Sequence, residues 1–158
     1  MNKITSRKKS RKYLFQKLFS LAYNFTDKND FNNSFMTDAY NDNLDEKYLE
    51  EMEKIIIENQ DKLIYILQLY APKFPIEKMD ITYIVPIFIW ASEMLFFSEE
   101  IPPKVSINEA IILSKKFGTD TTKKIVNWVL NKVYANYDEL KIKIKTIKNI
   151  DNFEIFKN

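Results

Sequence analysis

Basic side chains gather in the first 26 residues of the chain, which contain seven cations and no acid. The remaining residues carry 17 cations and 22 anions. A basic patch on a mildly acidic body is the usual footprint of a contact with nucleic acid or another anionic surface. Both arginines of the protein lie in this segment, and their planar donors match phosphate in a way that lysine cannot. The cations are Lys3, Arg7, Lys8, Lys9, Arg11, Lys12 and Lys17.

The basic segment could also be a solvated helix face or a targeting sequence. A lysine run is often a solvated face, but cations near a helix N-terminus oppose the macrodipole and repel one another, so the placement favours binding. A basic, acid-free N-terminus is also typical of an organelle transit peptide. We expect no secretory signal, because polar residues interrupt the apolar ones, and no transmembrane helix, because the most apolar run contains a proline and a glutamate. A cytoplasmic protein is the expectation.

The composition removes most catalytic chemistry. The chain has no cysteine and no histidine, which excludes thiolate nucleophiles, Cys/His zinc sites and imidazole general bases. Its single glycine, Gly118, cannot form a phosphate-cradling or dinucleotide-binding loop. We therefore expect a binding protein with no cofactor, no metal and no catalytic residue.

Hydrophobic spacing in the first half predicts helices. A first helix should run from Thr5 or Ser6 to about Phe25, since apolar residues recur along one stripe from Leu14 onward. Residues 26–44 are rich in Asn and Asp and suggest a variable loop with a short helix near 31–40. Further helices are expected over 44–59, with inward Leu49, Met52, Ile55 and Ile56, and over 61–70.

The apolar stretch from Ile81 to Ser98 should be the central buried helix. Pro86 leaves two possibilities there: the helix begins at the proline, or it continues through the proline with a kink.

The second half carries local start and stop signals. Two prolines precede Ser106, and Glu109 follows three residues later, so a capping box is expected to start a short helix at Ser106. Gly118 suits a left-handed C-cap. The next helix should start at Thr119 or Asp120, with its apolar stripe at Ile125, Val126, Val129, Leu130 and Val133. The Lys/Ile-rich tail is either a frayed helix or a small extended piece.

Two sequence motifs resemble those of the NusB family of bacterial antitermination factors. The stretch IPPKVSINEAIILSKKFG, followed by KKIVNWVLNKV, is similar to the family's carboxyl-terminal signature IPPKVxINEAxxLxKxFG and KFVNGVLDK. At the N-terminus, SRKKSRKYLFQKLFSLAY resembles RRxARxxALQxLY. Between them, IEKMDITYIVPIFIWASEMLF follows the outline of the family's central helix, and Glu93 matches its acid before the IPPKV turn.

The resemblance implies a fold and a function. The fold would be all-α, a compact bundle of about seven helices in two packed sub-bundles, with residues 1–140 as one domain and 141–158 as a C-terminal extension. The function would be to bind a boxA-like single-stranded RNA element of ribosomal RNA leaders. The protein would act with the ribosomal protein NusE and the RNA polymerase complex to suppress termination, with no membrane contact. The implied RNA-binding residues are Lys3, Arg7, Lys8, Lys9, Arg11, Lys12, Gln16, Phe19, Thr121 and Ile125.

Several positions depart from the family pattern. Thr121 and Ile125 stand where the family has an acid and an aromatic residue that approach RNA bases, and Trp128 replaces a glycine. Trp128 either fills the core or stacks on a ligand. Tyr83 and Phe88 replace an acid and an arginine that lie toward the NusE contact in the family, so these two are the expected partner-binding residues.

The departures leave a second function open: a NusB-like interaction module that homodimerises or docks an altered partner without specific RNA binding. NusB-like domains also occur fused to RNA methyltransferases, but this chain has no room for a catalytic domain.

Overall fold

Seven α-helices make up most of the described chain in the computed structural model, which describes residues 6–22, 43–73 and 80–147. No strand occurs among these residues, and the one isolated bridge pairs Ser6 with Leu44. The prediction of an all-α protein is confirmed. The helices are α1 (Arg7–Ala22), α4 (Glu46–Glu58), α5 (Gln60–Tyr70), α6 (Ile81–Leu95), α7 (Pro103–Phe117), α8 (Asp120–Ala135) and α9 (Tyr137–Ile144).

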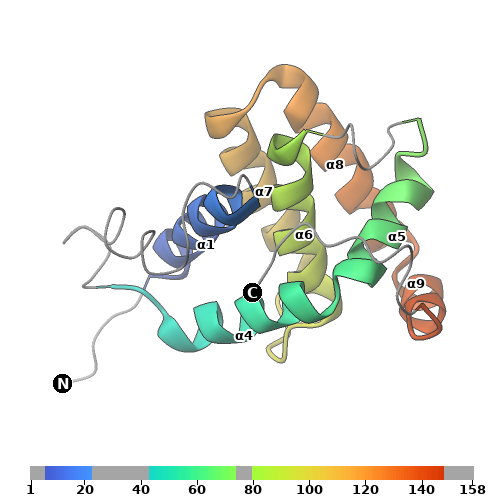
Figure 1. Cartoon of the computed structure of the whole chain (residues 1–158), viewed down its shortest axis with the longest axis horizontal. Coiled ribbons are helices and arrows are strands. Elements are labelled where there is room, and N and C mark those ends of the chain that lie inside the picture. Colours follow the sequence, from blue (N-terminus) through green and yellow to red (C-terminus); the bar gives the residue numbers. More distant parts are fainter. Residues whose placement is uncertain (1–5, 23–42, 74–79, 148–158) are drawn as a thin grey trace.

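Helix α6 lies in the middle of the other helices (Figure 1) and packs against α1, α4, α5, α7 and α8. Every residue from Ile84 to Leu95 is buried, because a helix surrounded on all sides must be apolar all round. The prediction of a central buried helix is confirmed. None of the helices in the described ranges is long and apolar enough to cross a membrane.

Pro86 lies inside α6, so the prediction that the helix could begin there is wrong. The helix begins at Ile81, where the Asp80 side chain caps it by accepting from the Thr82 N–H at 2.8 Å. Proline has no N–H, so the Thr82 carbonyl loses its helical donor.

The expected start of α7 at Ser106 is wrong. The helix begins at Pro103, where a missing N–H does no harm, and Ser106 is buried inside it. Its hydroxyl is therefore not a cap; it donates to the Glu93 carboxylate at 2.9 Å.

Gly118 is not a left-handed cap, since its φ is −132° and its ψ is −160°. The glycine is needed for space: a Cβ at this position would lie 2.7 Å from the side chain of Thr122. Thr122 is itself fixed, because it forms a capping box with Thr119, the predicted start of α8.

The remaining helix predictions agree with the structure where residues are described. Leu49, Met52 and Ile56 are buried as expected, whereas Ile55 is half-buried. The described part of the tail begins with the short helix α9, which continues across residue 140 and buries Leu140 and Ile144. The predicted loop and short helix at 26–44 fall almost entirely outside the described residues, as does the end of the first helix after Ala22.

Candidate nucleic-acid interface

Helix α1 presents lysines to solvent at its N-terminal end. Lys8 and Lys9 are exposed, and Lys12, one turn after Lys8, is half-buried. Ser6 caps the start of the helix, because its hydroxyl accepts from the Lys9 N–H at 3.1 Å. These three lysines are available to phosphate groups. Lys3 precedes the described residues.

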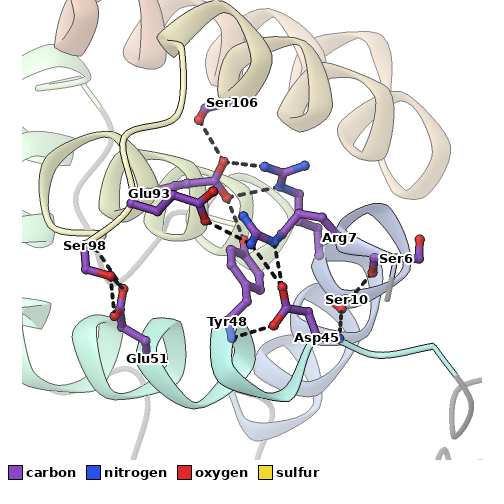
Figure 2. A network of polar contacts seen from close by, with 11 residues as sticks. Ser6, Arg7, Ser10, Asp45, Tyr48, Glu51, Glu93, Ser98 and Ser106 are labelled. Carbon is purple, nitrogen blue, oxygen red and sulfur yellow. Dashed lines mark hydrogen bonds and ion pairs between the residues drawn. The ribbon is translucent and has the colours of Figure 1, made fainter. Parts of the chain in front are cut away.

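Arg11 points into the protein instead, where it forms a buried ion pair with Glu93, which is labelled in Figure 2. Its Nη2 and Nε donate to the two carboxylate oxygens of Glu93 at 2.7 and 3.1 Å. Arg11 is only 6% exposed, so the prediction that it contacts RNA is corrected: its guanidinium is paired with Glu93 inside the protein. The same carboxylate accepts from Tyr48 at 2.6 Å and from Ser106 at 2.9 Å.

The Glu93 cluster therefore joins four helices through one carboxylate: Arg11 comes from α1, Tyr48 from α4, Glu93 from α6 and Ser106 from α7. Burial, the Glu93 charge and the hydrogen bond to Glu93 raise the pKa of the Tyr48 phenol. Tyr48 thus stays a neutral donor. Although burial opposes its charge, the hydrogen bonds and charge of Glu93 raise the pKa of Arg11, which keeps its guanidinium charged.

Arg7 is held by two further acids at the edge of this cluster. Its Nη2 lies 3.0 Å from Asp45 and 3.0 Å from Glu99, and its guanidinium sits 4.6 Å from the centroid of the Tyr48 ring. Burial alone would raise the pKa of Asp45, but hydrogen bonds from the Tyr48 N–H and from Arg7 outweigh it and lower that pKa. The Arg7 side chain is 28% exposed, so it reaches the surface already paired.

Aromatic rings connect α1 with the C-terminal end of α7. Phe15 stacks on Phe19 at 6.0 Å between centroids and on Phe117 at 5.1 Å. Gln16 and Phe19, both predicted to support RNA binding, are half-buried. These ring contacts hold α1 against the end of α7.

The predicted positions on α8 lie on its outer surface. Thr121 is exposed and Ile125 is half-buried. Trp128 is 54% exposed, so the possibility that it fills the core is wrong.

Of the two predicted partner-binding residues, only Tyr83 reaches the surface. It is half-buried near the start of α6. Phe88 is fully buried, so the prediction that it contacts a partner is corrected: this ring belongs to the core.

Sequence reasoning missed the pairing of Arg11 with Glu93. Glu93 matches the family pattern, but nothing in that match identifies it as a partner of α1. The available signal was an acid inside a nearly continuous apolar helix, because a buried carboxylate needs a cation or several donors.

Comparisons with known proteins agree with the fold. The sequence model of the NusB family matches residues 8–135. A relative from Clostridium perfringens named transcription antitermination protein NusB is 35% identical over 133 residues, covering 83% of this chain and 98% of the relative. A Shewanella woodyi protein of the same name is 32% identical over 136 residues, covering 83% of this chain and 96% of its own length.

Among solved structures, T. maritima NusB superposes with a TM-score of 0.69, covering 84% of this chain and 92% of that one. At 24% identity, this likeness supports the all-helical fold. The match of the family model over most of the chain, together with relatives above 30% identity, establishes the family. The chain belongs to the NusB family.

Proposed function

We propose that this chain binds a boxA-like single-stranded RNA of ribosomal RNA leaders and, with a NusE-type ribosomal protein, suppresses termination by RNA polymerase. Membership of the NusB family, whose relatives carry the name transcription antitermination protein, supports the process. The observation that carries RNA binding is the pair of exposed lysines on α1: Lys8 and Lys9 reach solvent, and no carboxylate is bonded to them in the described region.

The positions of the basic side chains change which residues we expect to contact phosphates. Arg7 and Arg11 are bound to acids, and Lys17 lies 2.8 Å from Glu53. The phosphate contacts then fall to Lys8, Lys9 and Lys12, with Lys3 as a fourth candidate. About four such contacts predict a log–log salt slope of roughly −3 for a single strand.

The test is a titration of a labelled boxA-like RNA at several salt concentrations. Lys8→Gln/Lys9→Gln protein should bind more weakly, with a slope smaller in magnitude by about 1.4. Lys143→Gln/Lys145→Gln is the matched control, because it removes the same charge from exposed positions near α9. A flat salt response in the wild type, or equal losses in the two variants, would contradict the assignment of α1.

The partner is tested separately by mixing the chain with the NusE-type protein and measuring molar mass by light scattering. A one-to-one complex is expected, weakened by Tyr83→Ala. A homodimer that does not exchange with the partner would favour the alternative of an interaction module.

A further inference from the structure

Trp128 is a large apolar side chain that the fold holds at the surface. It is 54% exposed, and its indole Nε1–H donates to the Tyr70 carbonyl at 2.9 Å, which ties α8 to the end of α5. The Lys132 ammonium lies 4.5 Å from the ring centroid. The hydrogen bond fixes the indole in one orientation, so little conformational freedom remains to be lost when a ligand binds.

The indole borders a shallow hollow of about 420 Å³ between α5 and α8. Among the described residues, the walls are apolar apart from two exposed lysines, and no carboxylate lines them. An occupant of this hollow needs a flat apolar part and a negative charge. The lining residues are Tyr70, Ala71, Pro72, Lys73, Lys124, Ile125 and Trp128.

The hollow continues the predicted RNA surface of α8. Residues at spacings of three and four share one face of a helix. Thr121, Ile125 and Trp128 follow this spacing. Lys124 and Lys132 lie four residues before and four residues after Trp128. Seven residues of helix separate Thr121 from Trp128 by about 10 Å along the axis. A strand that reaches Thr121 can therefore extend to the indole.

We infer that Trp128 is a stacking platform for one base of a single-stranded RNA, with Lys73 and Lys124 facing the phosphates on either side. This inference rests on the proposed function. Every base has a π-face, so stacking is tolerant of sequence, and it would replace the aromatic contact that Ile125 cannot supply. Lys73 and Lys124, which line the hollow, and Lys132, which lies against the indole ring, favour a nucleic acid over an apolar peptide.

Intrinsic fluorescence of the unmodified chain tests the contact directly. The protein has two tryptophans, and Trp90 is fully buried. Stacking should quench Trp128 and shield it from acrylamide when a boxA-like RNA is added. Trp128→Phe protein, whose remaining tryptophan is Trp90, should show almost no fluorescence change while still binding the RNA.

Affinity measurements with labelled RNA give the second readout. Trp128→Ala should weaken binding by about fivefold to 150-fold, whereas Trp128→Phe should retain most of the affinity. The salt slope of Trp128→Ala should equal that of the wild type. Removing the indole changes no phosphate contact, so the number of counterions released when RNA binds stays the same. Circular dichroism melting of each variant separates a loss of the ring from a loss of folding.

The outcomes distinguish the inference from the proposal beneath it. If RNA binds with the expected salt slope but Trp128 fluorescence and the Trp128→Ala affinity stay unchanged, the platform is wrong and the proposed function stands. If no RNA binds to the wild type at any salt concentration, both fail. Quenching by the NusE-type protein without RNA would instead assign the hollow to a protein partner and overturn the platform.

Discussion

Glu93 shows how strongly one buried carboxylate depends on its partners. Its side chain has no exposed surface and accepts hydrogen bonds from Arg11, Tyr48 and Ser106. A buried charge without compensation would cost several kcal/mol. The guanidinium supplies two parallel donors to the carboxylate, which the single ammonium of a lysine cannot do.

Replacing Arg11 by Met should therefore lower the free energy of unfolding by about 3–5 kcal/mol, since Glu93 is left as an uncompensated buried charge. Urea denaturation followed by circular dichroism measures this loss. The matched variant is Lys8→Met, which removes an exposed cation from the same helix and should change the stability by less than about 0.5 kcal/mol. Equal effects of the two variants would show that the Arg11 pair contributes little.

Asp45 links the start of α4 to the start of α1. It caps α4 by accepting from the Tyr48 N–H at 3.1 Å, and it binds Arg7 at 3.0 Å. Its own N–H donates to the Ser10 hydroxyl at 2.7 Å, and the Ser10 hydroxyl in turn donates to the Ser6 carbonyl. The two helix ends are thereby joined through a capping residue.

The lowered pKa of Asp45 gives a direction to its pH dependence. A carboxyl whose folded pKa is depressed stabilises the fold above its unfolded pKa of about 3.9, and this stability is lost as the pH falls through the folded pKa. Asp45→Asn keeps the cap but removes the charge, so it should destabilise the protein by less than about 1 kcal/mol at neutral pH. The difference from the wild type should vanish in acid, as measured by urea unfolding at each pH. A difference that persists at low pH would show that the Asp45 charge is not the source of the effect.

At the level of elements, the sequence predicted those helix ends that depend only on neighbouring residues. The start of α8 follows from Thr119, whose hydroxyl caps the helix through a capping box with nearby Thr122. The predicted start of α7 is wrong because Ser106 has the residue type and spacing of a cap, yet its hydroxyl serves Glu93 on another helix. The prediction for Gly118 is wrong for a similar reason: the glycine is needed for space against Thr122, not for a left-handed backbone.

Across the whole molecule, the basic side chains of the N-terminal segment fall into two groups. Arg7, Arg11 and Lys17 are bound to acids on other elements, while Lys8 and Lys9 remain in solvent. The segment and its helical form could be predicted from the sequence. The division could not, because Arg11 and its acid are separated by 82 positions and no local spacing connects them.

The central place of α6 predicts that the described helices unfold together. This helix contacts α1 and α4 as well as α7 and α8, and Glu93 ties these groups through hydrogen bonds. Neither group can leave without exposing the apolar surface of α6, so a single cooperative transition is expected. In Trp128→Phe protein, the fluorescence of buried Trp90 reports the α6 core while circular dichroism reports total helix. The two signals should give one urea midpoint. Two separate midpoints would mean that the helices around α6 unfold independently and that the Glu93 cluster does not couple them.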